Sequence, residues 1–182
     1  SPARVKLARD LAGLGPDIII QHHPHVLQGI EYYGNTLIAY SLGNFVFPVY
    51  GSGYGDKYHD NASESVYLSV HVKEDDDGKR TMTYDVVPVQ LDKQNNTFFP
   101  AEDKCKAIKA DLNKYSEALK DDKFLRDVYY QECRKQMRDL VYDLYYRSAK
   151  HGIIAGFRYL KKHLETKSHT NWMRGYFTFG RY

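Results

Sequence analysis

Residues 14–45 read LGPDIIIQHHPHVLQGIEYYGNTLIAYSLGNF, and this stretch carries the clearest evidence of the fold class. After Asp17, Ile18–Ile20 form a short apolar, β-branched run, the pattern of a strand buried on both faces in a sheet covered by helices. Three histidines follow at positions 22, 23 and 25, with Pro24 between the last two. Open α/β sheets gather their ligand sites beyond the carboxyl ends of strands, so this position favours ligand binding.

The segments on either side complete an α/β pattern. Apolar residues recur at helical spacing over residues 1–14, and Gly15-Pro16 ends the predicted helix. Two strands joined at Gly34-Asn35 are predicted next. Gln28 and Glu31 are further candidates for a functional site, but an exposed strand position is the favoured interpretation of each. The Asp77-Gly78 turn joins two runs of alternating apolar and polar residues, which predicts a β-hairpin. The predicted fold class is therefore α/β.

The pattern changes near Pro100, where long segments at helical spacing begin. Charge changes there as well: residues 1–100 carry 8 basic and 12 acidic side chains, whereas residues 101–182 carry 18 and 11. We therefore predict two regions, residues 1–100 and an α-helical region over residues 101–182. Cys105 and Cys133 lie in the helical region, and their spacing does not decide whether they pair.

Composition describes a globular chain with a hydrophobic core. The 182 residues are 42% hydrophobic, and the formal net charge of +3 is too mild to predict nucleic-acid binding. No stretch approaches the roughly 20 apolar residues that a membrane-spanning helix needs. The chain opens on Ser1-Pro2 and reads as the interior of a longer protein, so membrane association is expected only through sequence before Ser1.

The histidine cluster and the SLGNF segment are the candidate functional residues. Because neutral imidazole is a common ligand of transition metals, His23 and His25 can serve one metal ion or two neighbouring ions. Solvated histidines are the alternative interpretation of the local pattern. Ser41 and Asn44 are candidates for lining the same pocket, although Gly43-Asn44 is also typical of a turn that ends a strand.

Residues 14–47 closely resemble the capsule-synthesis CapA family, whose signature runs close to G-A-D-x-V-I-G-H-H-P-H-V-x-Q and later Y-S-L-G-N-F. Members of that family look like calcineurin-type metallophosphatases. The resemblance implies that residues 1–100 are the C-terminal half of a calcineurin-like αββα sandwich, followed by an α-helical appendage. It also implies a cell-envelope location at the outer face of the cytoplasmic membrane. The implied partner is an anionic capsular polymer, poly-γ-glutamate or polysaccharide, or its biosynthetic complex.

The same resemblance assigns roles to the candidate residues. His23 and His25 are expected to be ligands in a centre of two divalent metal ions, Mn, Fe or Zn. His22 is expected to be catalytic, as a proton donor, and Ser41 and Asn44 to bind substrate. The family's other ligand motifs are absent from the 22 residues before His23. We therefore expect a fragment of a metal-dependent, phosphatase-like hydrolase that is inactive alone. The alternatives are a non-catalytic polymer-binding or assembly subunit and a structural module.

The C-terminal segment from residue 157 is basic and aromatic. It suits an anionic membrane surface or an acidic polymer, but a helix docked on its own domain with a solvated lysine face is the favoured interpretation. The charged and apolar candidates are Arg158, Lys161, Lys162 and Lys167, and Phe157, Leu160 and Leu164.

Overall fold

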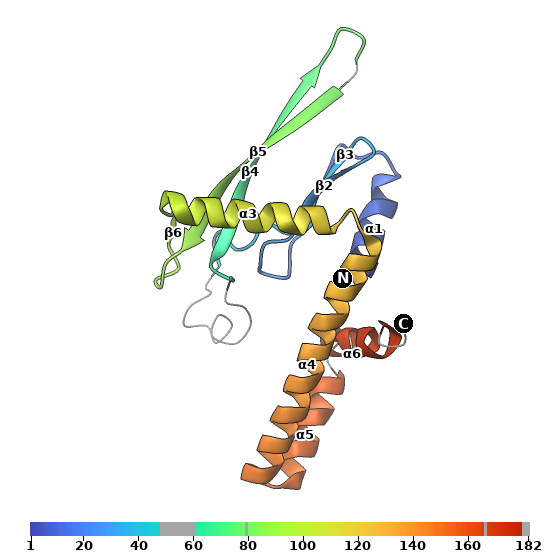
Figure 1. Ribbon diagram of the computed structural model, residues 1–182, viewed down its shortest axis with the longest axis vertical. Helices are drawn as coiled ribbons and strands as arrows, with labels where there is room; N and C mark the ends of the chain where they lie inside the picture. Colours follow the sequence, from blue (N-terminus) through green and yellow to red (C-terminus); the bar gives the residue numbers. More distant parts are fainter. Residues whose placement is uncertain (48–60, 79, 166, 180–182) are drawn as a thin grey trace. The chain divides into compact units, whose positions relative to one another are not determined.

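The computed structural model describes residues 1–47, 61–78, 80–165 and 167–179 (Figure 1). The chain forms two compact units. The first comprises Ala3–Lys120, and the second comprises Asp121–Tyr182 together with Ser1–Pro2.

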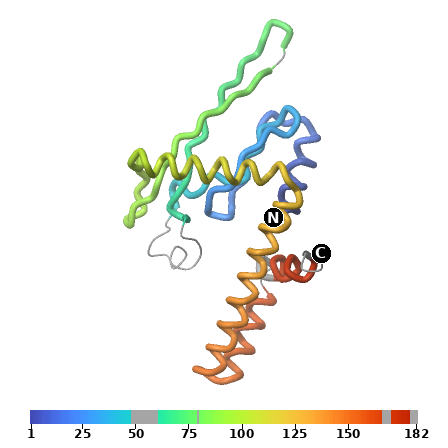
Figure 2. The backbone as a smooth tube through the Cα atoms, viewed as in Figure 1, coloured from blue at the N-terminus to red at the C-terminus, as the bar shows by residue number. Residues whose placement is uncertain are grey.

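In its described residues the first unit contains two three-stranded sheets and the helices α1 and α3, and Figure 2 traces its backbone. In one sheet the strand order is β1-β3-β2, with β1 parallel and β2 antiparallel to β3. The other sheet has the order β4-β5-β6 and is antiparallel throughout. This mixed architecture confirms the predicted α/β class. Its elements are α1 (Pro2–Ala12), β1 (Ile18–Ile20), β2 (Ile30–Tyr33), β3 (Thr36–Ala39), β4 (Glu64–Glu74), β5 (Arg80–Leu91), β6 (Thr97–Phe98) and α3 (Glu102–Ala118).

Both predicted strand pairs form at the turns that the sequence indicated. Strands β2 and β3 pair from Ile30 opposite Ala39 to Tyr33 opposite Thr36. Gly34, in the connecting turn, has a φ of +60°, a conformation that glycine adopts without a Cβ penalty. The longer hairpin of β4 and β5 turns at Gly78, whose backbone N–H donates to the Asp75 carbonyl at 2.9 Å.

The predicted burial of the isoleucine run is wrong. Ile18 and Ile20 in β1 are 36% and 52% exposed, because β1 lies at the edge of its sheet. The central strand β3 is instead the one buried on both faces, and Leu37, Ile38 and Ala39 are all 0% exposed. A continuous apolar run therefore identified a strand correctly but did not reveal its place in the sheet order.

Helix α3 closes the core of the first unit, and Figure 1 shows it crossing the β4 and β5 strands. Its buried residues Ile108 and Leu112 pack in one cluster with Leu37 of β3 and Val66 of β4. The C-terminal helices begin at Glu102, but the compact units divide after Lys120, since α3 packs on this core.

A partly buried ion pair ties α1 to β2 on the other face of the first sheet. Arg9 Nε and Nη2 donate to the two carboxylate oxygens of Glu31, each at 2.9 Å. Arg9 Nη2 also donates to the Leu119 carbonyl at 2.7 Å, and the Tyr40 hydroxyl donates to Glu31 Oε1 at 2.7 Å. The predicted exposure of Glu31 is thus wrong: its side chain is only 12% exposed. Burial, followed by the hydrogen bond to Glu31, raises the pKa of Tyr40.

The second unit is helical in its described residues. It consists of α4 (Asp122–His151), α5 (Ile153–Glu165) and α6 (Lys167–Phe179). The Asp121 carboxylate caps α4 by accepting from the backbone N–H groups of Lys123 and Phe124 at 2.8 and 3.1 Å. The core of this unit contains Cys133, Leu140 and Trp172.

Two further points concern the helices. Cys105 and Cys133 are free cysteines, so they do not pair with each other. Within the described residues, none of the helices combines the length and apolar character that crossing a membrane requires.

Candidate functional site

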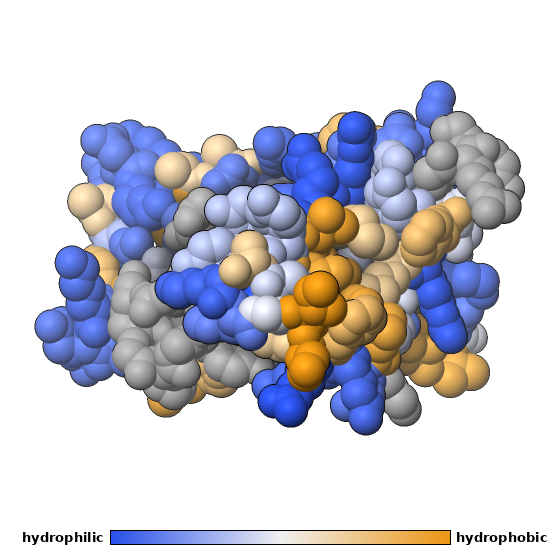
Figure 3. Space-filling view, turned by 90° about the horizontal axis from the view of Figure 1, so that it is seen from below, coloured by the Kyte–Doolittle hydropathy of each residue, from blue (hydrophilic) through white to orange (hydrophobic). Residues whose placement is uncertain are grey.

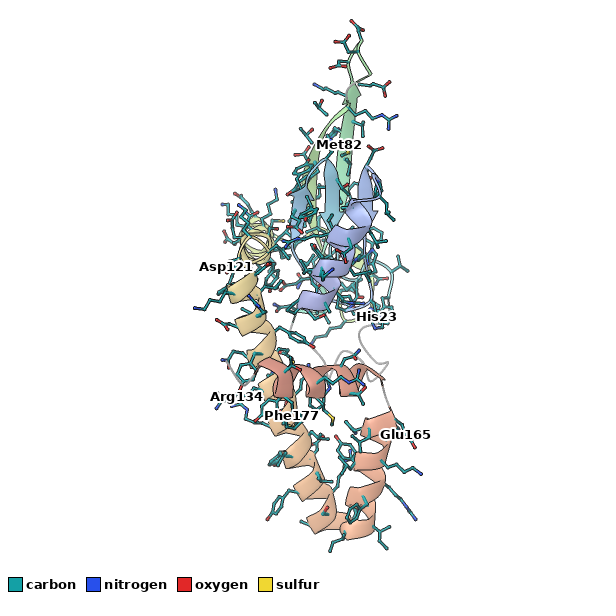
Figure 4. The ribbon with its side chains drawn as sticks, turned by 90° about the vertical axis from the view of Figure 1, so that its right-hand side faces the viewer. His23, Met82, Asp121, Arg134, Glu165 and Phe177 are labelled. Carbon is teal, nitrogen blue, oxygen red and sulfur yellow. The ribbon has the colours of Figure 1, made fainter. Side chains whose placement is uncertain are left out.

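The histidine loop lies at one edge of the first sheet. Because β1 and β3 are parallel neighbours, their carboxyl ends meet at the same edge. Backbone hydrogen bonds fasten the loop to the end of β3: Gln21 N–H donates to the Ala39 carbonyl at 2.8 Å and Gln28 N–H to the Ser41 carbonyl at 3.0 Å. Figure 4 shows His23 on this loop, at the end of the first unit away from the tip of the β4–β5 hairpin.

Asn44 determines the tautomer of His25. The Asn44 Nδ2 group donates to the carbonyls of His25 and Ala62, at 3.0 and 2.8 Å, which fixes the orientation of the carboxamide. Its Oδ1 therefore faces His25 Nδ1 at 2.8 Å, and only a protonated Nδ1 can donate to that oxygen. In the neutral imidazole the lone pair consequently lies on Nε2, the arrangement by which a hydrogen-bond partner prepares a histidine for metal ligation.

The loop backbone is held in an uncommon conformation at both candidate ligands. His23 has a φ of +104° and His25 a φ of +59°, a region that non-glycine residues rarely adopt. Such conformations persist only where surrounding contacts impose them, and they cluster at functional sites. The hydrogen bond from Asn44 to the His25 carbonyl is one contact that holds the loop in place.

The rings of the loop lie close together. The centroids of the His23 and His25 rings are 6.3 Å apart, and the His25 ring lies against Phe47 in a tilted arrangement, with centroids 4.2 Å apart and an interplanar angle of 33°. Phe47 restricts rotation of the His25 ring from one side, while Asn44 fixes its Nδ1 edge. His25 is therefore oriented by two neighbours.

The other predicted site residues differ in accessibility. His22 is exposed, whereas Ser41 and Asn44 are 1% and 4% exposed. Gly43 N–H donates to Ser41 Oγ at 3.4 Å, and both donor positions of the Asn44 amide are used within the chain. The structure thus brings His25 and Asn44 together, with Ser41 buried below the same strand end.

The sequence did not predict that Asn44 contacts His25, nor did it predict the contributions of Phe47 and Ala62. One signal for the first contact was present, because His25 and Asn44 each follow a strand that ends at the same edge of the sheet. No feature of the sequence indicated that the Ala62 carbonyl accepts from Asn44. The two residues are 18 positions apart, and only the folded structure brings them together.

These residues fit a divalent metal ion as two nitrogen donors. The Asn44-oriented imidazole has the tautomer that ligation through Nε2 requires, and His23 lies beside it. Across the described part of the chain, however, no three His, Cys, Asp or Glu side chains form a group that could hold a metal ion. A complete ligand set is therefore not formed by the described residues.

The protein is therefore an α/β protein that carries a histidine-bearing loop at the carboxyl ends of two adjacent parallel strands. Residues 1–49, which include the loop and Asn44, match the family described as "Bacterial capsule synthesis protein PGA_cap". This part of the chain is therefore similar to the CapA family, which confirms the predicted resemblance.

Three relatives illustrate the similarity. The PGA biosynthesis protein CapA of Bacillus subtilis (strain 168) is 38% identical over 86 residues, covering 47% of this chain and 20% of that protein. The capsule biosynthesis protein CapA of Bacillus anthracis is 38% identical over 91 residues, covering 50% and 19%. The uncharacterized protein y4sH of Sinorhizobium fredii (strain NBRC 101917 / NGR234) is 51% identical over 41 residues, covering 22% and 9%. The chain thus spans about a fifth of the length of the CapA relatives that it matches.

Proposed function

We propose that this chain contributes His23 and His25 to a divalent-metal centre in a capsule-biosynthesis protein of the CapA type. In this proposal the complete protein is a phosphatase-like hydrolase of the cell envelope that acts on an anionic capsular polymer or its precursor. Residues 3–120 would form the C-terminal half of its αββα sandwich. The names of the CapA relatives support the role in capsule synthesis.

The observation that carries the metal proposal is the hydrogen bond between His25 Nδ1 and Asn44 Oδ1 at 2.8 Å. If His25 were simply a solvated histidine, no buried asparagine side chain would be needed to fix which of its ring nitrogens carries the proton. Here a 4% exposed asparagine uses its remaining polar atoms to fix its own orientation, and the backbone of His25 is held at a φ of +59°. This arrangement presents Nε2 in a defined direction.

Two divalent ions, Mn, Fe or Zn, would lower the pKa of a bound water and hold a phosphoryl oxygen in place. In this proposal, His23 and His25 hold the ions and Asn44 orients His25. His22 is exposed next to them, where it can donate a proton to the leaving group of a substrate. The remaining ligands would come from other parts of the complete protein.

Nitrogen-15 NMR of the 182-residue chain tests the ligand assignment without an activity assay. Near pH 8, the neutral His25 ring should show the tautomer protonated at Nδ1. Mn²⁺ should broaden the ring signals of His23 and His25 selectively, and H25A should remove the effect at His23. H71A is the matched control, because His71 is exposed on β4 and contacts Asp85 at 3.1 Å. Equal broadening at His71 and at the two candidate ligands, or a neutral His25 ring protonated at Nε2, would contradict the assignment.

Activity is tested in the full-length protein. H25A should reduce Mn²⁺-dependent hydrolysis of a phosphate ester by at least about a hundredfold, whereas H71A should leave it unchanged. H22Q should lower kcat while Mn²⁺ broadening of His23 and His25 is retained. Polymer binding that survives loss of both ligands, in a protein with no hydrolytic activity, would instead favour a non-catalytic assembly subunit.

A further inference from the structure

Apolar side chains are exposed where α4 meets α5. Ile153 and Ile154 are each 70% exposed, and Phe157 is 67% exposed. Helix α5 packs on its own unit through a different face, on which Gly156 is buried and Leu160 joins the core around Trp172. The helix therefore docks on its own unit, as the favoured interpretation of the sequence predicted, but only through one face, and its apolar residues Ile153, Ile154 and Phe157 stay exposed.

The exposed apolar residues lie within a cationic segment. Residues 143–165 contain five Lys or Arg residues against two acidic residues, Asp143 and Glu165, and Glu165 lies 3.9 Å from Lys161. On α5, Arg158 follows Phe157 directly, and Lys161 lies one helical turn further along the same side. The five cations are Arg147, Lys150, Arg158, Lys161 and Lys162.

Tyrosines on the last turns of α4 border the same end of the helix pair. Tyr142 and Tyr145 are 66% and 73% exposed, and Lys150 Nζ donates to the Tyr146 hydroxyl at 3.2 Å. Tyrosine combines an apolar ring with a polar hydroxyl and is enriched where proteins meet the membrane–water interface. Seen from the end of Figure 1 at which α4 meets α5, Figure 3 shows hydrophobic surface bordered by hydrophilic side chains.

We propose that this surface, the α5 tip, inserts shallowly into the headgroup region of an anionic lipid bilayer. The α5 tip is defined as Ile153, Ile154, Phe157, Arg158 and Lys161. Its apolar side chains would enter the boundary between headgroups and acyl chains, while its cations and Lys150 would contact lipid phosphates. The surface is independent of the histidine loop, which lies in the other unit.

Charge and apolar character together favour a lipid surface over a second copy of the chain or a nucleic acid as the binding partner. A second copy of the chain would place one cationic segment against another, since the five cations outnumber Asp143 and Glu165 and leave a formal charge of +3 over residues 143–165. A nucleic acid would engage the cations but give Ile153 and Ile154 no apolar environment. An anionic bilayer satisfies both requirements, since it supplies phosphates and an apolar layer beneath them.

Close helix packing presents the α5 tip in a defined position. A Cβ added to Gly156 would collide with Ser148 Oγ of α4, so glycine allows the two helices to approach closely. Gly152, with a φ of +85°, makes the turn between them. The tip is therefore held on α4 before any lipid binds, which reduces the ordering that binding requires.

Co-sedimentation of the whole chain with vesicles tests the proposal. The chain should bind vesicles containing phosphatidylglycerol and phosphatidylcholine at least about tenfold more tightly than pure phosphatidylcholine vesicles. The double variant I153S/I154S should reduce binding to the anionic vesicles by at least about tenfold. V141S is the matched control, because Val141 is 59% exposed on α4 but lies twelve residues before Ile153. Equal binding of I153S/I154S and V141S would overturn the proposal.

A second pair of variants separates lipid from other anionic ligands. R158Q/K161Q should weaken binding to the anionic vesicles, whereas K106Q/K109Q on α3 should not. If double-stranded DNA or soluble polyglutamate binds the chain more tightly than the vesicles do, and I153S/I154S leaves that binding unchanged, the surface is a polyanion site and the proposal fails.

Fluorescence gives an independent readout of insertion. Trp172 is the single tryptophan and is 9% exposed in the core of the helical unit, so its emission reports whether each variant remains folded. In I154W/W172F the new indole should shift its emission to shorter wavelength with anionic vesicles only. An unchanged emission maximum would show that the tip stays in water and would contradict insertion.

Discussion

Asn44 holds His25 at two points: its Oδ1 accepts from the ring Nδ1 at 2.8 Å, and its Nδ2 donates to the main-chain carbonyl at 3.0 Å. One side chain thus fixes the tautomer of the imidazole and stabilises the positive φ of the same residue. The pair joins the loop after β1 to the segment after β3, so the site depends on the parallel pairing of these two strands.

Replacing Asn44 with alanine should affect both the fold and the ligand. N44A leaves the carbonyls of His25 and Ala62 without their donor, so the free energy of unfolding should fall by about 2 kcal/mol or more. The neutral His25 ring should then populate both tautomers in nitrogen-15 NMR, and its affinity for Mn²⁺ should fall by about 10- to 100-fold.

Two further variants separate these effects. N44D keeps an acceptor for Nδ1 but loses both donors, so it should retain the tautomer while losing stability. N113A, at an exposed position on α3, should change stability by no more than about 0.5 kcal/mol. A wild-type tautomer in N44A would show that Asn44 does not select it.

Gly43 should tolerate no side chain, unlike Gly34. Both have a positive φ, of +82° and +60°. A Cβ on Gly43 would collide with the Glu64 carbonyl and lie 2.7 Å from Ser65 Cβ, whereas a Cβ on Gly34 would meet nothing within 4 Å. Urea unfolding should show a loss of more than about 2 kcal/mol for G43A and about 1 kcal/mol for G34A. Equal losses would mean that backbone conformation alone is responsible.

The Arg9–Glu31 ion pair should couple more strongly than the exposed pair on the same helix. Arg9 and Glu31 have side chains 20% and 12% exposed and share two hydrogen bonds. Lys6 and Asp10 are 76% and 58% exposed. Double-mutant cycles to alanine should give a coupling energy of about 1–3 kcal/mol for the first pair and under about 0.5 kcal/mol for the second. Similar values for both pairs would argue against an anchoring role for Arg9.

Stability should fall at alkaline pH because of Tyr40. Burial and the hydrogen bond to Glu31 raise its pKa in the folded state above the ordinary value of 10.0. Above pH 10 the unfolded chain releases the tyrosine proton and the folded chain retains it, so the free energy of unfolding decreases with pH. The decrease attributable to one such group is about 1.4 kcal/mol per pH unit.

The variant Y40F isolates this contribution from those of other tyrosines. At pH 7 it should be less stable than the wild type by about 1 kcal/mol, since it lacks the hydrogen bond to Glu31. Between pH 10 and 11.5 the difference should shrink and then reverse. Parallel stability curves over this range would refute the assignment to Tyr40.

Local sequence determined the elements of the fold. Helical spacing identified α1 and the C-terminal helices, and the turn residues at Gly34 and Gly78 placed both strand pairs correctly. The histidines and their position after a strand were also visible, as was the resemblance to the CapA family. These features depend on neighbouring residues, whose effect on backbone conformation is local.

Which side chains are buried and which residues contact one another followed only from the tertiary structure. The order β1-β3-β2 left Ile18 and Ile20 exposed, although their composition is that of a buried strand. Glu31 forms a partly buried ion pair with Arg9 because α1 packs across strand β2. Asn44 met His25 because two parallel strands end at one edge of the sheet. Burial and hydrogen-bond partners are set by which elements pack together, and no single segment carries that information.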